Sequence, residues 1–469
     1  SSDPVTLSGK DEVHEAFYAF SELMCDEQMW DIEGKEASRS VVRELLEENP
    51  EYFKENILGK DLRLTIRVPN PNYEKVEQKA ILEILENIPR SYDTAQAFYE
   101  SEKAPIFEVI MPMTTSSKDL ERVYHYYKEH VSGKGKHRPF DASVEEWVGE
   151  IKPDHVNVIP LIEEKEKMLK SHNIVGDFLE NKDLNYQRVF LARSDPALNY
   201  GLIPAVLINK LALKKLSDLN DRIDTEIYPI IGTGSSPFRG NLKPGRIKNS
   251  LEEYKSVHTF TIQSAFKYDN PKEDIKEAIR KIKEAKKGKT SINNEKKCLR
   301  LIEKVSNEYR KNIVKLADSI NEISHLVPSR RSRKLHIGLF GYSRKIQQEN
   351  SDEIKLPRAI KFTASLYSLG IPPEIIGIRS LNDREMDYLM EKAYNKITTD
   401  LKDSLSYFNE EALNKYPFLE EDIKKAKEYV DFNVNEKHKK ITTEILNENN
   451  DEIKKSKIIE AAKIRKFLG

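Results

Sequence analysis

Residues 156–163 read VNVIPLIE and residues 187–195 read QRVFLARSD, two short apolar runs that each end in a charged residue. Longer stretches with helical spacing follow both runs. Near-continuous apolar strands separated by helices are typical of a parallel sheet with helices on its outer faces. Five further runs have this character: RLTIRVPN from Arg63, FEVIMPMTTS from Phe107, EIYPIIGTGSSPFRG from Glu226, VHTFTIQSAF from Val257 and KLHIGLFGYSR from Lys334. Seven such runs predict an α/β fold, a TIM-type (β/α)8 barrel whose eighth strand we cannot place.

Helical patterns flank the predicted barrel on both sides. We expect an N-terminal helical segment over residues 1–62, in which residues 10–60 read as helical. The barrel would cover residues 63–345, with a Lys-rich helical insertion near 272–305, and a C-terminal helical region would cover 346–469. Pro357 and Gly370 frame a single helix in that last region. We expect all three parts to pack as one catalytic unit.

The composition excludes several classes of protein. Lys and Arg number 77 against 78 Asp and Glu, so no basic excess points to nucleic acid or anionic lipid. No apolar run approaches the roughly 18 residues of a membrane span, and the N-terminus lacks the apolar core of a signal peptide. Cys25 and Cys298 are too few for a disulfide framework or a four-ligand zinc site. We expect a cytoplasmic protein with no membrane or nucleic-acid partner.

Two strand endings supply carboxylates: Glu163 ends VIPLIE and Asp195 ends FLARSD. Barrel enzymes place their chemistry in the loops at the carboxyl ends of the strands. Magnesium typically takes one or two protein carboxylates and completes its octahedron with water and substrate oxygens. The alternative is that Glu163 or Glu164 is merely the N-terminal acid of the next helix, and that Asp195 caps another.

The ending GTGSSPFRG, residues 232–240, could hold an anion. Its glycines, including Gly234, let main-chain N–H groups approach an oxyanion, Ser235 adds a hydroxyl, and Arg239 adds a bidentate donor. The stretch is not a Walker loop, because it lacks the Gly-Lys-Ser/Thr ending. An ordinary flexible loop would have the same composition.

A basic cluster surrounds the last run, PSRRSRKLHIGLFGYSR. Arg330, Arg331 and Arg333 precede the run and Arg344 ends it. Basic residues at one barrel mouth would suit a substrate that carries both carboxylate and phosphate, since one cation about 4 Å from an anion contributes about 4 kcal/mol at an effective dielectric near 20. A surface basic patch or a targeting signal would look the same in sequence.

Taken in order, these strand endings resemble one family, the short, archaeal-type phosphoenolpyruvate carboxylases. The resemblance covers nearly the whole chain, through CDEQMWDIEGKE, LTIRVPNP, EVIMPMTTS, VIPLIE, FLARSDPALNYG, GTGSSPFRG, TFTIQSAFKYD, RKLHIGLFGYSR and SLYSLGIPPEIIG. More distantly it resembles the longer carboxylases of bacteria and plants. The resemblance implies that the enzyme converts phosphoenolpyruvate and bicarbonate to oxaloacetate and phosphate, with Mg²⁺ or Mn²⁺ as cofactor.

Carried over by position, the resemblance implies roles for most of these residues. Glu163 and Asp195 would hold the metal, and Arg239 would meet the phosphate or carboxyphosphate. The catalytic set would also include Arg330, Arg331 and Arg344; the substrate-binding set would be Gly234, Ser235, Gln263, Lys267 and Arg333. A homotetramer, with aspartate or malate as an effector, is implied as well.

The chain also departs from the family. The long enzymes have a second arginine in the loop that resembles GTGSSPFRG, where this chain has Thr233. Short members begin with a stretch containing Thr-Gln-His-Pro-Asp-Asn, whose histidine is the family's acid/base. This sequence lacks the stretch, so we name no catalytic histidine and expect that the stretch precedes residue 1. A non-catalytic phosphoenolpyruvate or dicarboxylate sensor, or another barrel lyase of phosphoenolpyruvate or pyruvate, are the alternative functions.

Overall fold

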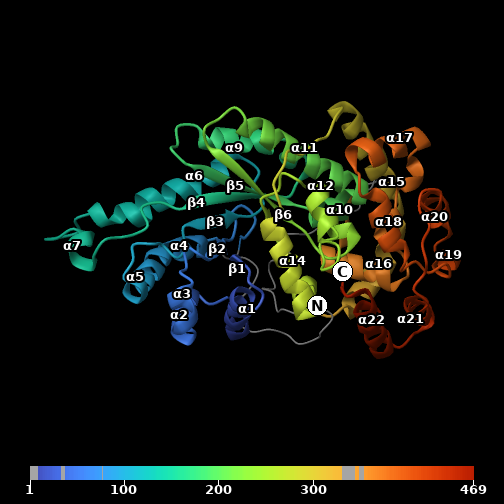
Figure 1. Cartoon of the computed structure of the whole chain (residues 1–469), viewed down its shortest axis with the longest axis horizontal. Coiled ribbons are helices and arrows are strands. Elements are labelled where there is room, and N and C mark those ends of the chain that lie inside the picture. Colours follow the sequence, from blue (N-terminus) through green and yellow to red (C-terminus); the bar gives the residue numbers. More distant parts are fainter. Residues whose placement is uncertain (1–8, 33–36, 76–77, 330–343, 348–352) are drawn as a thin grey trace.

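A computed structural model describes residues 9–32, 37–75, 78–329, 344–347 and 353–469. Its centre is a seven-stranded parallel sheet in which the strands follow one another in sequence order, β1 to β7. Helices surround the sheet, and the C-terminal helices form a separate group at one end of the molecule (Figure 1). The predicted α/β fold, a parallel sheet with helices on its outside, is confirmed. The described residues form a seven-stranded half-barrel and not the closed eight-stranded barrel that the prediction names.

The strands are short. They are β1 Glu27–Asp31, β2 Arg63–Arg67, β3 Glu108–Met111, β4 Asn157–Ile162, β5 Tyr186–Ala192, β6 Glu226–Gly232 and β7 Thr259–Phe260, with the antiparallel pair β8 Arg344–Gln347 and β9 Glu353–Leu356. The helices up to the sixth strand are α1 Gly9–Ser21, α2 Val41–Glu48, α3 Pro50–Glu55, α4 Ala80–Glu86, α5 Ile88–Tyr99, α6 Ser117–His125, η1 Tyr126–Val131, η2 Ser132–Lys136, α7 Val144–Val148, α8 Lys165–Leu169, α9 Ser171–Leu179, α10 Ser194–Tyr200 and α11 Leu202–Asn220.

After the sixth strand the chain is mainly helical. The elements are η3 Pro237–Arg239, α12 Ile247–Glu253, α13 Ser264–Tyr268, α14 Lys272–Glu284, α15 Glu295–Leu326, α16 Ala359–Ser368, η5 Pro373–Ile375, η6 Ile378–Ser380, α17 Asp383–Tyr388, η7 Leu389–Ala393, α18 Ile397–Leu405, α19 Ala412–Lys415, η8 Pro417–Leu419, α20 Glu420–Lys427, α21 Glu436–Asn447 and α22 Asp451–Arg465. The helix predicted between Pro357 and Gly370 is confirmed as α16.

The sheet curves around an interior that is filled by an ionic group and an apolar cluster. Arg188 of β5 donates to Glu27 of β1 at 2.8 and 2.5 Å and to Glu108 of β3 at 3.0 Å. The same guanidinium lies 3.5 Å from the hydroxyl of Thr259 in β7. Since β1 and β7 are the two edge strands, one side chain contacting both shows that the sheet wraps around its interior. Next to this ionic group, an apolar cluster that includes Ile110, Ile159, Leu161, Phe190 and Ile230 fills the inside.

One part of the predicted organisation is wrong, and another lies outside the described residues. The N-terminal segment is not purely helical, because Glu27–Asp31 form β1 and pair in parallel with β2. Only Trp30 and Asp31 of this strand are buried, so its polar sequence concealed it. At the other end, the predicted barrel strand from Lys334 lies outside the described residues as far as Ser343. Arg344, which the prediction places just after that strand, begins an antiparallel pair with β9.

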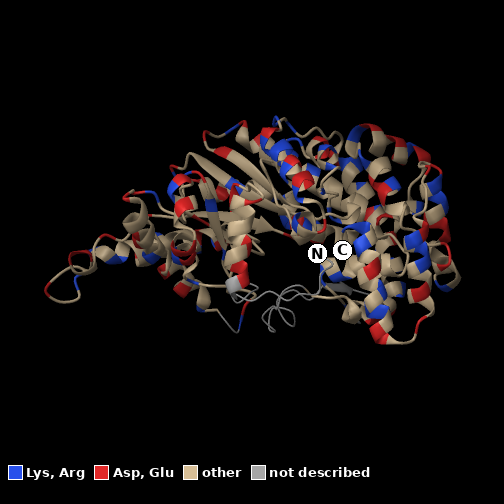
Figure 2. Cartoon of the chain, turned by 60° about the horizontal axis from the view of Figure 1, so that its bottom comes forward, with Lys and Arg blue, Asp and Glu red and all other residues tan. Residues whose placement is uncertain are grey.

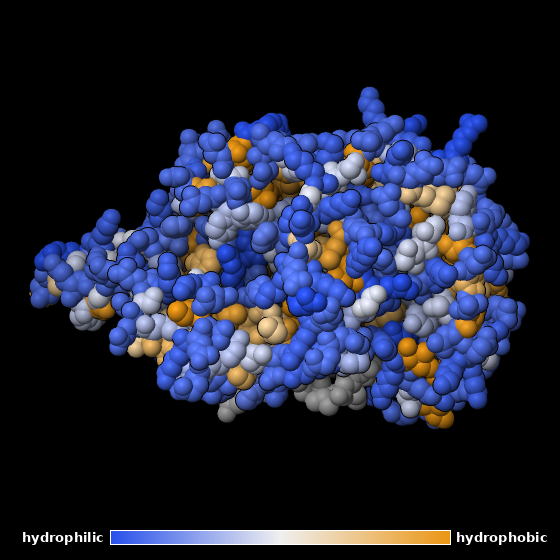
Figure 3. All heavy atoms as spheres, in the orientation of Figure 1, coloured by the Kyte–Doolittle hydropathy of each residue, from blue (hydrophilic) through white to orange (hydrophobic). Residues whose placement is uncertain are grey.

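The surface carries both signs of charge throughout. Lys and Arg intermix with Asp and Glu over the helices (Figure 2), as the near-zero net charge predicts. The outer face is mostly hydrophilic, with scattered apolar patches (Figure 3). No helix of the described part of the chain is both long enough and apolar enough to cross a bilayer.

Candidate active site

Glu163 and Asp195 both follow the carboxyl ends of neighbouring strands. In the parallel pair β4–β5, Ile162 is opposite Leu191, so the two carboxylates leave the sheet at the same edge. Glu163 is half-buried and accepts a hydrogen bond from the N–H of Met113 at 3.1 Å. Thus Glu163 helps to hold the loop after β3 beside the end of β4.

The alternative, that each carboxylate only begins or caps a helix, has a different outcome for Glu163 and for Asp195. Helix α8 begins at Lys165 with Glu164 as its N-cap, one residue beyond Glu163. Asp195 lies in the first turn of α10, where the helix dipole favours an acid. Across the described ranges, no group of three or more His, Cys, Asp or Glu side chains is arranged to hold a metal ion. A divalent cation at this edge would have two protein carboxylates, a number that magnesium commonly takes.

Arg239 lies buried where three chain segments converge. Its Nε donates to Ser194 Oγ at 3.1 Å, and Ser194 is the neighbour of Asp195. Its Nη2 donates to Gln263 Oε1, just after β7, and its Nη1 donates to an oxygen of Gly469 at 2.6 Å. None of these partners is a side-chain carboxylate. Burial, reinforced by the nearby charge of Arg193, lowers the pKa of Arg239 to about 10, and the guanidinium stays charged at neutral pH.

The loop after β6 is shaped around this guanidinium. A Cβ on Gly234 would lie 2.9 Å from Arg239 Cζ, so only glycine leaves room for the arginine in its present position. The hydroxyl oxygens of Ser235 and Ser236 are buried and have no hydrogen-bond partner among the described residues. Buried hydroxyls normally find a partner. Two such hydroxyls beside a buried arginine are suited to bind an anion.

Thr233, at the place of the long enzymes' second arginine, has a structural contact. Its hydroxyl donates to the carbonyl of Thr261 at 3.2 Å and thereby joins the loops after β6 and β7.

The second buried arginine of this region is Arg193 at the end of β5. It donates to Tyr254 Oη at 2.9 Å and to the carbonyl of Phe238 at 3.0 Å. Arg193 therefore fixes the residue that precedes Arg239.

Sequence reasoning missed an ion pair at the same edge of the sheet. Arg67 at the end of β2 pairs with Asp31 at the end of β1, with 2.7 Å between Nη2 and Oδ2, and Asp31 is buried. Both residues share the inward face with Thr65 and Met29, since side chains of one face recur every second residue. The charged residue in LTIRV was the available signal, because a charge that ends an apolar strand points into a barrel mouth.

The remaining predicted site residues divide into two groups. Gln263 lies in the Arg239 cluster, whereas Lys267, four residues later, forms a 2.5 Å ion pair with Glu15 of α1. That pair ties the N-terminal helix to the region after β7. Arg330, Arg331 and Arg333 lie outside the described residues, and of Arg344 the structure describes only the strand position.

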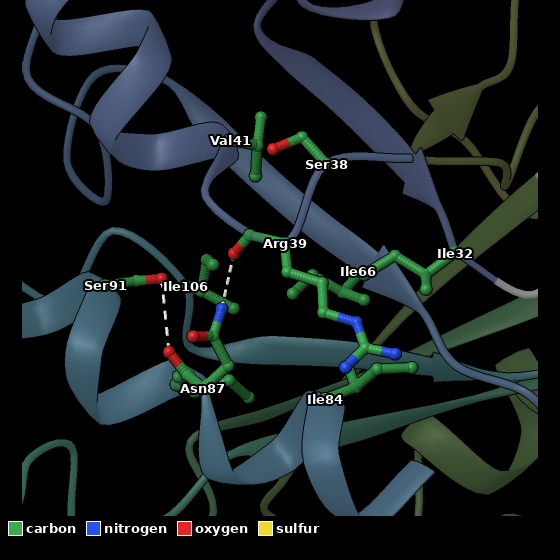
Figure 4. A pocket seen from close by; sticks show the side chains of 10 residues that line it. Ile32, Ser38, Arg39, Val41, Ile66, Ile84, Asn87, Ser91 and Ile106 are labelled. Atoms are coloured by element: carbon green, nitrogen blue, oxygen red, sulfur yellow. Dashed lines mark hydrogen bonds between the residues drawn. The ribbon is translucent and has the colours of Figure 1, made fainter. Parts of the chain in front are cut away.

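A small pocket lies away from this site. Figure 4 shows it between the loop after β1, the outer side of β2 and helices α4 and α5. Its lining is mainly apolar, and Asn87 bridges it by donating to the carbonyl of Arg39 and accepting from Ser91 at 3.3 Å. None of the predicted site residues lines this pocket, so we do not place the reaction there.

Comparison with known proteins gives the same assignment as these strand endings. The family described as phosphoenolpyruvate carboxylase matches residues 2–469. A phosphoenolpyruvate carboxylase of Methanothermobacter thermautotrophicus is 47% identical over 468 residues, covering 99% of this chain and 95% of that protein. One of Methanospirillum hungatei is 45% identical over 474 residues, covering 100% and 96%, and one of Pyrococcus horikoshii is 49% identical over 409 residues, covering 87% and 85%. The chain belongs to the phosphoenolpyruvate carboxylase family.

Proposed function

We propose that this chain catalyses the carboxylation of phosphoenolpyruvate by bicarbonate, giving oxaloacetate and phosphate. The observation that carries the proposal is the buried Arg239, which joins the ends of β5, β6 and β7 beside two buried serine hydroxyls. Phosphoryl transfer needs such a fixed cation and donors more than it needs covalent chemistry from the protein. Family membership supplies the identity of the substrate.

Glu163 and Asp195 would hold a divalent cation, Mg²⁺ or Mn²⁺. Their chemistry fits such an ion, because hard cations prefer carboxylate oxygens and both groups leave the sheet at one edge. When bound, the ion would stabilise negative charge on the enolate oxygen by several kcal/mol.

The protein's own side chains would bind the substrate's anionic groups and help to exclude water. Arg239 would bind the phosphate oxygens, with Ser235 and Gly234 N–H as neighbouring donors, while bicarbonate attacks phosphorus. The attack breaks the bond between phosphorus and the enol oxygen and gives carboxyphosphate and the enolate of pyruvate. Carboxyphosphate would then split into CO2 and phosphate, and the enolate carbon would bond to this CO2 to give oxaloacetate. Arg67 would bind a carboxylate at the opposite side of the mouth, with Asp31 fixing its direction. The burial of Arg239 would help to keep water from an enolate formed beside it.

The finer organisation is also a proposal. We infer that residues near Lys334 complete the barrel and that Arg330, Arg331, Arg333 and Arg344 bind substrate anions together with Lys267. The boundaries 1–62, 63–345 and 346–469 would describe one catalytic unit. The resemblance supports a cytoplasmic homotetramer and aspartate or malate as an inhibitory effector.

The test is oxaloacetate formation, coupled to malate dehydrogenase, with magnesium and bicarbonate each omitted in turn. Turnover that needs both would establish the carboxylase. An Arg239→Met variant that still folds should lose turnover by about 10²-fold or more, as for removal of one oxyanion donor. Phosphoenolpyruvate binding without any turnover, measured on a chain that includes the family's histidine stretch, would instead establish the sensor function.

A further inference from the structure

Lys243 lies in the loop after β6, four residues beyond Arg239. This loop folds back on itself, because the N–H of Leu242 donates to the carbonyl of Gly234 at 3.0 Å. The N–H of Gly234 in turn donates to the carbonyl of Arg239 at 2.8 Å. The backbone that leads into Lys243 is therefore bonded directly to the stretch that surrounds the buried guanidinium.

The side chain of Lys243 extends toward the C-terminal segment that supports Arg239. Its Nζ lies 5.7 Å from the centre of the Phe467 ring, and Phe467 is fully buried. Two residues later, Gly469 accepts the hydrogen bond from Arg239 Nη1. Figure 1 shows this end of the chain beside α10 and α16. Both the main chain and the side chain of Lys243 thus adjoin residues that hold Arg239 in place.

The ammonium group of Lys243 has no hydrogen-bond or ion-pair partner among the described residues, and its one contact of this kind is with the Phe467 ring. Asp403 is the carboxylate whose charge acts most on Lys243, but it bonds to Arg246 at 2.8 Å and to Asn241 at 3.2 Å instead. Burial lowers the pKa of Lys243, and the charge of Asp403 offsets part of this effect. Charges that are withdrawn from water normally have a partner, so an unpaired cation here is suited to bind an anion.

The alternative is that Lys243 only covers the ring of Phe467. Lysine side chains commonly pack their apolar stem on a hydrophobic surface while the ammonium group stays in water. In that case the methylene groups would matter and the charge would not. Replacement by methionine, which keeps an unbranched apolar stem, separates the two roles.

The proposed reaction contains an anion to which no described side chain has been assigned. Arg239 and Ser235 would bind the phosphate of phosphoenolpyruvate and Arg67 would bind its carboxylate, whereas bicarbonate has no residue of its own. Bicarbonate must approach a phosphate that has the same sign of charge, so the approach needs a further cation next to the phosphate site. An ammonium group suits this small anion, because it is a compact charge with three donors that can rotate.

We propose that Lys243 binds bicarbonate beside the phosphate group that Arg239 holds. The proposal rests on the carboxylase reaction proposed above and adds the residue that positions its second substrate. The ammonium group donates to one bicarbonate oxygen and leaves another oxygen free to attack phosphorus. Loss of the charge therefore weakens the binding of bicarbonate more than the binding of phosphoenolpyruvate.

Steady-state kinetics on the active enzyme, with the family's histidine stretch included, is the first test. Lys243→Met should raise KM for bicarbonate by ~10-fold or more, as for loss of a hydrogen bond to a charged group, with a much smaller change in KM for phosphoenolpyruvate. Lys243→Arg restores a cation and should recover most of the loss. The proposal is overturned if KM for bicarbonate in Lys243→Met is unchanged, or rises no more than KM for phosphoenolpyruvate.

Lys287→Met is the matched control. Lys287 also lies over a phenylalanine ring, with its Nζ 5.8 Å from the centre of Phe260, and burial also lowers its pKa. Its charge acts on His258, which precedes β7, so it belongs to the amino end of that strand and not to the candidate active site. Neither KM should change in this variant. An equal rise of KM for bicarbonate in both methionine variants would mean a general effect of charge and would overturn the proposal.

Chemical labelling tests binding without turnover. Acetic anhydride acylates uncharged amines, and mass spectrometry of the peptide that contains Lys243 gives the rate of its labelling. With magnesium left out, bicarbonate should slow the labelling of Lys243 several-fold relative to chloride at equal ionic strength, and should leave Lys287 unaffected. Protection of Lys243 by inorganic phosphate and not by bicarbonate would assign it to the phosphate site and overturn the proposal. A wild type without carboxylase turnover would refute the proposed function, whereas the labelling would still decide whether Lys243 binds bicarbonate.

Discussion

Replacing Gly234 by alanine should disable Arg239 without unfolding the protein. The new Cβ would lie 2.9 Å from Arg239 Cζ and 3.0 Å from its Nη1, where carbon contacts normally lie at about 3.5–4.0 Å. The guanidinium must therefore move by roughly 0.5–1 Å. A movement of that size stretches its 3.1 Å bond to Ser194 toward the limit for a hydrogen bond. Misplacement of a catalytic group by about 1 Å can lower the rate by ~10²-fold, about 2.7 kcal/mol.

The same substitution should change stability little. Loss of a hydrogen bond costs about 1 kcal/mol, and the smaller entropy of the unfolded alanine variant offsets about 0.4–1 kcal/mol of it. The assay is kcat/KM for phosphoenolpyruvate together with thermal unfolding. Gly176→Ala is the matched control, since its Cβ would make an ordinary 3.7 Å contact with Leu219. A Gly234→Ala enzyme with activity within about threefold of wild type would refute the role given to Arg239.

Three other substitutions test separate parts of the structure. Asp195→Asn should lower magnesium-dependent turnover by at least ~10²-fold and abolish any rise in melting temperature with added Mg²⁺; unchanged turnover would remove Asp195 from the metal site. Arg188→Met leaves Glu27 and Glu108 without their shared buried cation and should cost about 3–5 kcal/mol in urea unfolding. Burial raises the pKa of Glu374 to about 7 from 4.5, so the wild type should lose stability as pH rises through that window, by an order of 3 kcal/mol at most, whereas Glu374→Gln should not; parallel pH profiles would contradict this.

The predicted pH profile also concerns the candidate active site, because Glu374 contacts the loop that carries Arg239. Its Oε1 accepts from the N–H of Phe238 at 2.7 Å and from Tyr367 Oη at 2.7 Å. Phe238 precedes Arg239, so the carboxyl supports the loop after β6 from behind. Glutamine keeps that acceptor and removes only the ionisation.

The sequence predicted the strands that carry apolar, β-branched residues on both faces, because such runs are recognisable without their neighbours. It missed β1, since EQMWD is polar and becomes a strand only when Glu27 pairs with Arg188 across the interior. For the same reason Glu163, Asp195 and Arg239 were found at strand ends, while Arg193 and the Asp31–Arg67 pair were not. Those residues act through partners that are distant in sequence, and no local pattern reveals such partners.

The contacts of Arg239 bring together residues 194, 263 and 469, the last of which is 230 positions away in the chain. During synthesis, a ribosome would have released every strand of the sheet well before residue 469 emerged. A nascent or truncated chain could thus form the sheet and still lack one of the three supports of its buried arginine. Removal of the segment after α22 would therefore take one support from the anion site without removing any strand of the sheet.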